Sequence, residues 1–141
     1  MIGAIAGRFV PVKFHIKEQP AMFDRFEVHW TPTQVVLDAD GEERDRIEGF
    51  LPVDDFIARL EVALGRTAFD RADYAEAASR FREACEHHAG AGAAPEACYW
   101  AGVAEYKRTK EQGPLRETAR LLSERYPGNE WTRKASVWSG S

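Results

Sequence analysis

The feature that most constrains this chain is a change in its apolar pattern near residue 60. Before that point, short runs rich in β-branched residues alternate with Gly, Pro and Asp turn signals, which is typical of strands and hairpins. Beyond it, alanine-rich segments repeat their apolar residues at helical spacing, and no strand is expected there. The 141 residues therefore divide into an α/β segment and an all-α segment.

The composition is that of an ordinary globular protein, with 44% hydrophobic and 30% charged residues. The net charge of −4 is small, and the basic residues are scattered, so neither nucleic acid nor an anionic membrane is expected as a partner. No apolar run reaches the ~20 residues that cross a bilayer. The apolar start, residues 1–7, lacks the preceding basic residue of a secretory signal, so a cytoplasmic location is expected.

The α/β segment predicts a strand, a helix, a hairpin and a second helix, in that order. Residues 9–16 alternate with period two and predict the first strand, and residues 19–28 carry the apolar face of a short helix. Residues 33–38 and 42–49 are strand-like runs joined by an Asp-Gly turn, which is a strong hairpin signal. Residues 52–64 return to helical spacing and predict the second helix.

The all-α segment predicts helices separated by turn signals. Residues 65–88 read as helix with a turn near 71–73, and the Gly- and Ala-rich loop 89–95 interrupts the pattern. Further helices are predicted over 96–107 and 114–126, and a last short one over 131–138. The aromatic residues of this segment are expected to pack in its core.

Residues 9–64 give a strand, a helix, a hairpin and a helix, and Trp30-Thr31-Pro32-Thr33 lies just before the hairpin. This order and this motif resemble the second half of a thioredoxin-like domain. The resemblance implies a cis Thr31–Pro32 bond and a peptide or partner chain bound in extended form along Trp30, Thr31, Pro32 and Thr33. Residues 1–64 are therefore predicted to form a truncated domain, a partial thioredoxin-like sheet within an α/β fold class.

The Cys-x-x-Cys motif of that family is absent from this sequence. Disulfide exchange needs a thiolate whose pKa is lowered, commonly at a helix N-terminus, and a second thiol that resolves the mixed disulfide. We therefore expect no catalytic residue, no metal and no cofactor, and we interpret the chain as a non-catalytic protein-interaction module. The alternative is a fragment of a thiol-disulfide oxidoreductase whose half containing Cys-x-x-Cys is absent from this chain.

The resemblance also implies that one strand of the sheet is missing. In the family's order, that strand lies between the two runs found here at residues 9–16 and 33–38. The remaining strands must pair directly, or another chain must fill the gap, because an exposed apolar edge promotes association. We therefore expect a homo-oligomer, a dimer in its simplest form.

Residues 64–84 resemble a tetratricopeptide repeat. Gly65 and Ala77 are small enough for two antiparallel helices to approach, while Phe69, Tyr74 and Phe81 fill the space between them. A weaker copy begins 37 residues later, at Gly102. Residues 65–141 are therefore predicted to form an all-α tetratricopeptide-like helical domain, which either binds a peptide or protein partner or covers a sheet or dimer interface.

The two cysteines and the nearby histidines admit more than one interpretation. Cys85 and Cys98 flank the loop at 89–95 and could form a disulfide, but two buried free thiols are favoured for a cytoplasmic chain. Cys85, His87 and His88 could suggest a metal site, yet their spacing does not converge on one helix face. We interpret the histidines as favourable charges at a helix C-terminus.

Overall fold

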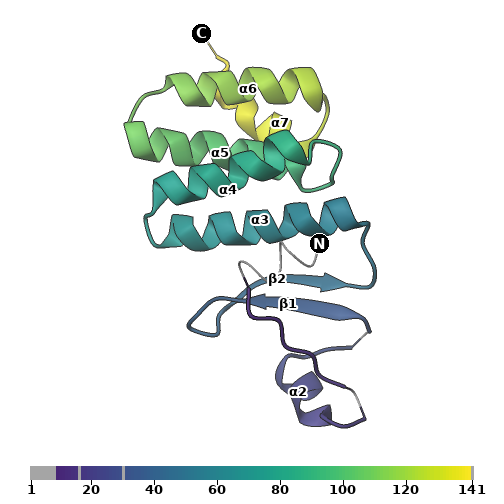
Figure 1. The fold of residues 1–141 in the computed structure, drawn as a ribbon. Coiled ribbons are helices and arrows are strands. Elements are labelled where there is room, and N and C mark those ends of the chain that lie inside the picture. Colours follow the sequence, from purple (N-terminus) through teal and green to yellow (C-terminus); the bar gives the residue numbers. More distant parts are fainter. Residues whose placement is uncertain (1–8, 16, 30, 141) are drawn as a thin grey trace.

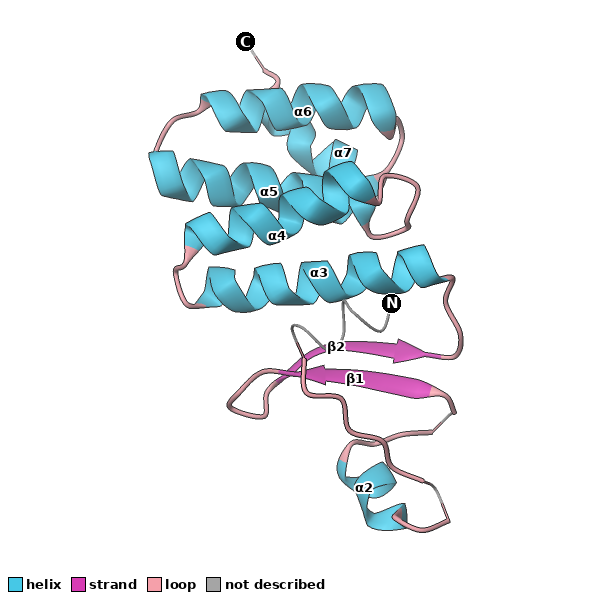
Figure 2. Cartoon of the chain, viewed as in Figure 1, coloured by secondary structure: helices cyan, strands magenta, loops and turns pink. Residues whose placement is uncertain are grey.

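The computed structural model describes residues 9–15, 17–29 and 31–140. A two-stranded sheet lies on one side of a long helix, α3, and the remaining long helices stack on its other side (Figure 1). The elements are α2 (Pro20–Arg25), β1 (Thr33–Leu37), β2 (Glu43–Glu48), α3 (Val53–Asp70), α4 (Tyr74–His87), α5 (Ala94–Thr109), α6 (Gly113–Arg125), α7 (Glu130–Ala135) and the 3-10 helix η1 (Ser136–Trp138). Figure 2 shows how strongly helices predominate after β2.

The predicted hairpin is present as β1 and β2, which pair in antiparallel register. Its turn is closed by the carboxylate of Asp38, whose Oδ1 accepts hydrogen bonds from the backbone N–H groups of Asp40 at 2.9 Å and Glu42 at 3.0 Å. Gly41 adopts φ of 84°, a conformation that glycine takes without strain. The register pairs Val36 with Asp45 and Leu37 with Glu43, so the strand β2 bulges at the residue between them.

Helix α3 contacts the sheet on one side and the helical stack on the other. Leu60 and Ala63 pack with Val36 of β1, whereas Ala58 and Val62 belong to the core shared with α4 and α5. The helix runs without interruption through residues 64 and 65, where the sequence predicts a domain boundary. A single element therefore supplies apolar side chains to both cores.

The helical stack is built on close approaches at glycine. A Cβ atom added to Gly65 in α3 would lie 2.6 Å from the ring of Phe81 in α4, which is too short for any real contact. A Cβ added to Gly102 in α5 would collide in the same way with Thr118 in α6. In each case the partner lies 16 residues after the glycine, and the two glycines are 37 residues apart. The two helix pairs therefore repeat one packing arrangement.

The strand predicted for residues 9–16 is wrong for the residues that the structure describes. Residues 9–15 contain no strand, and Ile16 lies outside the described residues. A strand is stable only beside a neighbour that satisfies its backbone groups, and the described sheet consists of β1 and β2 alone. The alternating pattern of residues 9–16 could not show whether a neighbouring strand is available for pairing.

The helix predicted for residues 19–28 is present but shorter. Helix α2 ends at Arg25, and Glu27 has φ of 52°, which lies outside the helical region. Pro20 occupies its first turn, where the missing N–H has no cost. The later helices agree with the predicted segments to within a few residues at each end. Among the described residues, no helix is both long and apolar enough to cross a membrane.

The preference for free thiols is also wrong. Cys85 and Cys98 form a disulfide that joins α4 to α5, and no cysteine is free. The two helices lie side by side, and the Cα atoms of the cysteines are 4.8 Å apart, within the range that a disulfide spans. The loop between the helices, which the sequence predicts correctly, brings the two residues together.

Candidate functional site

The predicted binding residues lie where the chain enters β1. The Thr31–Pro32 peptide bond is cis. Thr31 is exposed, Pro32 and Thr33 are half-buried, and Trp30 lies outside the described residues. The carbonyl of Pro32 accepts a hydrogen bond of 2.7 Å from the N–H of Gly49, so Pro32 begins the pairing of the two strands.

That hydrogen bond determines which backbone groups of β1 face away from β2. In an antiparallel pair, residues alternate between those bonded to the neighbour and those directed outward. Because Pro32 is bonded, Gln34 and Val36 are bonded as well, and the N–H and C=O groups of Val35 and Leu37 point toward the opposite edge. Within the described residues no strand pairs with that edge.

The side chains of β1 differ between its two faces. Val36 is buried against Leu60 and Ala63 of α3. Val35, on the opposite face, is half-buried, and Leu37 is 38% exposed. At Val35 and Leu37, the outer edge of β1 therefore combines backbone groups that pair with no strand of the described residues with an apolar face that is only partly covered.

The other edge of the hairpin is held by arginines. Arg59 of α3 donates from Nε and Nη2 to the two carboxylate oxygens of Asp45 at 3.0 and 2.6 Å, and Nη2 also donates to the carbonyl of Arg46 at 2.8 Å. Arg46 in turn donates to the carbonyl of Phe26, just after α2, at 2.5 Å. These bonds join β2 to α3 and to the residues after α2, so they hold the hairpin in place, while no strand of the described residues covers the outer edge of β1.

Two carboxylates of the hairpin have lowered pKa values. The pKa of Asp38 lies below its usual value, first because the backbone N–H of Glu42 donates to it, and further because Arg44 donates to it. A hydrogen bond from Arg46 lowers the pKa of Glu43. Both groups are therefore anionic at neutral pH, and their hydrogen bonds stabilise the hairpin.

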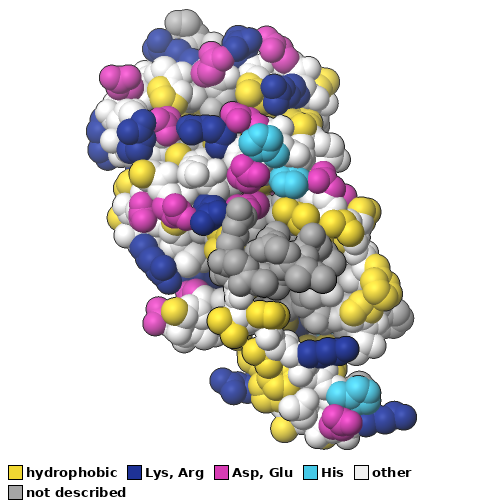
Figure 3. All heavy atoms as spheres, in the orientation of Figure 1, with side chains coloured by type: hydrophobic (Ala, Val, Ile, Leu, Met, Phe, Trp, Pro, Cys, Tyr) yellow, Lys and Arg dark blue, Asp and Glu magenta, His cyan; other side chains and the backbone are white. Residues whose placement is uncertain are grey.

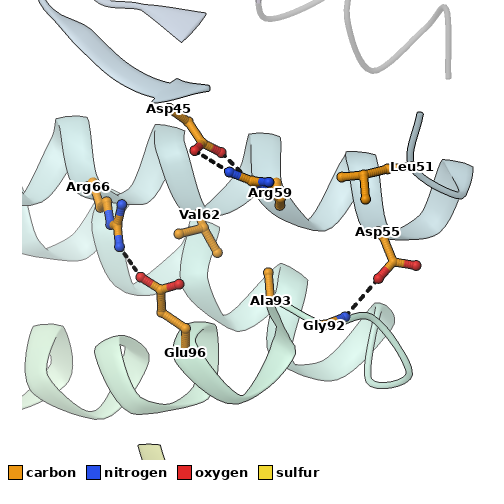
Figure 4. Close-up of a pocket in the computed structure, with 9 residues that line it drawn as sticks. All are labelled: Asp45, Leu51, Asp55, Arg59, Val62, Arg66, Gly92, Ala93 and Glu96. Carbon is orange, nitrogen blue, oxygen red and sulfur yellow. Dashed lines mark hydrogen bonds and ion pairs between the residues drawn. The ribbon is translucent and has the colours of Figure 1, made fainter. Parts of the chain in front are cut away.

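A groove of about 460 Å³ lies along α3, between β2 and the start of α5. Four residues of α3 line it at spacings of four, three and four, which places them on one face of the helix: Asp55, Arg59, Val62 and Arg66. Figure 4 shows Arg59 reaching toward Asp45 and Arg66 reaching toward Glu96. The lining of the groove is therefore mainly polar, and both of its arginines are paired with carboxylates.

The loop before α5 closes one end of this groove. The N–H of Gly92 donates to Oδ1 of Asp55 at 2.8 Å, and Nδ1 of His88 lies 2.5 Å from Oδ1 of Asp54. His88 therefore contacts the first turn of α3 rather than a metal site. Among the described residues, no group of three or more His, Cys, Asp or Glu is placed to hold a metal ion.

The sequence interpretation missed this groove. The spacing of the α3 residues was visible, because Val62 and its charged neighbours recur at helical intervals. The partners Asp45 and Glu96 come from different elements, and only the folded chain brings them to α3.

The comparison with family models concerns the part of the chain that contains this edge. Residues 3–64 match the model described as a thioredoxin-like domain. Residues 3–64 are therefore similar to a thioredoxin-like domain. The match includes Thr31, Pro32 and the whole hairpin, and it ends within α3. No curated protein and no solved structure matches the chain.

Proposed function

We propose that this chain is a non-catalytic thioredoxin-like protein-interaction module that also self-associates. The observation that supports it most is the outer edge of β1. There, Val35 and Leu37 direct backbone donors and acceptors away from the hairpin, beside the cis Thr31–Pro32 bond. An extended chain can bind such an edge by main-chain hydrogen bonds, with its alternate side chains giving specificity.

The proposed contacts extend from the residues before β1 into the strand. Trp30, Thr31, Pro32 and Thr33 would receive one end of the bound chain, and Val35 and Leu37 would bond to its backbone. Leu37 offers apolar surface to a side chain of the partner. The ligand class is therefore an extended peptide or the edge of another sheet, with no cofactor.

The state of the cysteines supports a role without catalysis. Both cysteines of the sequence are buried and bonded to each other, and both lie in α4 and α5 rather than beside Pro32. Exchange with a client disulfide requires an accessible thiolate. Disulfides are typical of oxidising compartments, which argues against the cytoplasmic location expected from the sequence.

The helical stack is proposed as a tetratricopeptide-like second contact region. The repeated glycine packing at Gly65 and Gly102 supports this interpretation. The groove along α3 has a volume within the usual range for ligand pockets, and its paired charges suit the donors and acceptors of a peptide backbone. The exposed Phe50, next to Leu51 at the groove, adds apolar surface for a partner side chain.

The alternative proposal is a thiol-disulfide oxidoreductase fragment, which the thioredoxin-like match also favours. An insulin reduction assay separates the two. We expect the chain and its Cys85→Ser/Cys98→Ser variant to reduce insulin in dithiothreitol at the same rate as dithiothreitol alone. Faster reduction by the parent chain than by the variant would contradict the proposed function.

A further inference from the structure

The segment before α2 exposes apolar side chains in an alternating pattern. We name residues 9–14 the arm. Val10 is 90% exposed and Val12 is 68% exposed, and Phe14 is also exposed. Figure 3 shows hydrophobic side chains gathered on the lower part of the visible face, near the sheet and α2, while charged side chains are frequent over the helices. The arm therefore has the alternating sequence of a strand, but its apolar side chains are exposed, as in a strand without a partner.

The backbone of the arm is unpaired within the described residues. The hydrogen bonds nearest to it begin at His15, whose carbonyl accepts from the N–H groups of Glu18 and Gln19. The arm is held at its start, because Phe9 packs against the cluster of Val36, Leu60 and Ala63. Farther along the chain, Arg46 donates to the carbonyl of Phe26, just after α2. The arm is thus presented beside the sheet without pairing to β1 of its own chain.

We propose that the arm of a second copy pairs with the outer edge of β1, and that the exchange is reciprocal in a two-fold dimer. This inference rests on the proposed function, in which that edge binds an extended chain. It identifies this extended chain as the arm of a second copy. The lengths agree, since at ~3.3 Å per residue the arm spans about 20 Å and β1 about 17 Å. A two-fold dimer covers both open edges and both arms at once, whereas an unrelated peptide leaves the arms exposed.

Pro11 restricts the register of this pairing. Proline has no N–H, so Pro11 must face away from β1, and the backbone groups of Val10, Val12 and Phe14 must face toward it. In the antiparallel arrangement in which the arm covers the whole length of β1, Val12 then lies opposite Val35 and Val10 opposite Leu37. Opposed residues share a face, so the exposed valines of the arm cover the half-buried face of β1.

Cross-linking between two pools of protein tests this register. One pool carries Val12→Cys and the other Val35→Cys, and the only native cysteines are bonded to each other, so the introduced thiols are the free ones. We expect a short bismaleimide to produce covalent dimers from the mixed pools and none from either pool alone. Cross-linking within the Val12→Cys pool, or within the Val35→Cys pool, would overturn the proposal, as would the absence of any covalent dimer.

A pair of charge variants on the arm provides a second test. Val12→Glu should weaken dimerisation about tenfold or more in sedimentation equilibrium, because it places a charge against Val35. The matched control Lys13→Glu changes the opposite face and should leave the dimer intact. Since both side chains are exposed in the single chain, neither variant should impair folding. A monomeric parent chain, or equal effects of the two variants, would overturn the arm exchange.

The two proposals fail separately. If Val12→Glu does not weaken the dimer, the arm exchange is wrong, and the edge of β1 can still bind a different partner. If the chain speeds insulin reduction, the non-catalytic role is wrong, whatever the oligomeric state.

Discussion

The helical stack from α3 to α6 and the segment from residue 9 to residue 53 use apolar residues in opposite ways. In the stack, small residues and Phe81 are fully buried, and the helices approach closely at Gly65 and Gly102. In the other segment, large apolar side chains such as Val10, Val12 and Phe50 face solvent. The difference suggests that the stack provides most of the stability and that the sheet side provides the surface for partners.

The two regions are joined mainly through α3. Leu60 and Ala63 contact the sheet, and Arg59 binds Asp45 of β2, while the opposite side of the helix packs on α4. A change in the stack should therefore affect global unfolding, and a change on the sheet side should affect association.

The largest expected effect comes from a comparison in which one phenylalanine is truncated to alanine in each region. Phe81→Ala should lower the free energy of unfolding by about 3 to 5 kcal/mol, because Phe81 has no exposed surface and its loss leaves a cavity. Phe50→Ala should change it by less than about 0.5 kcal/mol, since Phe50 is 90% exposed. Urea unfolding followed by circular dichroism measures both. Equal losses would show that the two regions share one core.

Removing the disulfide should have the next largest effect. The Cys85→Ala/Cys98→Ala variant should lose about 2 to 4 kcal/mol of stability, because the bond restricts the unfolded chain and joins two packed helices. Thermal unfolding with and without a reductant measures the loss. The reductant should lower the melting temperature of the parent chain only. If the reductant also lowered the melting temperature of the double variant, its effect could not be due to the Cys85–Cys98 bond.

A smaller effect is expected from filling the close approach in the stack. Gly65→Ala should cost about 1 to 3 kcal/mol, because the new methyl group collides with the ring of Phe81. The matched control is Gly90→Ala, where the added Cβ meets no atom within 4 Å. Denaturant midpoints of the two variants give the comparison. A stable Gly65→Ala variant would mean that α3 and α4 can separate without loss.

The smallest effect concerns the hairpin and pH. The folded pKa of Asp38 is lowered, so its carboxylate stabilises the hairpin above about pH 4, and this contribution is lost as the pH falls through the folded pKa. The protection factors of the amides in β1 and β2, which compare exchange with that of an unfolded chain at the same pH, should therefore fall in acid. Asp38→Asn should remove this dependence on pH, and Asp40→Asn should retain it. The prediction fails if both variants respond alike.

The sequence was informative where structure depends on near neighbours. Helical spacing predicted α3 to α6, and the Asp-Gly turn predicted the hairpin, because both signals act over a few residues. The sequence predicts a strand for the arm wrongly, because a strand also needs a distant partner, which period two does not reveal. It does not predict the Cys85–Cys98 bond, because the expected compartment favours free thiols although α4 and α5 lie side by side.

The candidate site was predicted only in part. Thr31, Pro32 and Thr33 could be identified from the resemblance to thioredoxin-like domains, since they directly precede the hairpin. The outward direction of Val35 and Leu37 depends on the hydrogen bond between Pro32 and Gly49, which requires the register. The groove along α3 depends on ion pairs between elements distant in the sequence.

Residue-resolved amide exchange in β1, measured over a range of protein concentrations, tests the central claim most directly. The account predicts that Gln34 and Val36, which are bonded to β2, are protected at every concentration. Val35 and Leu37 should exchange quickly in dilute solution and become protected as the concentration rises and a second chain pairs with the edge. Protection of Val35 and Leu37 that does not depend on concentration would contradict the account, because it would mean that the edge is already closed within one chain.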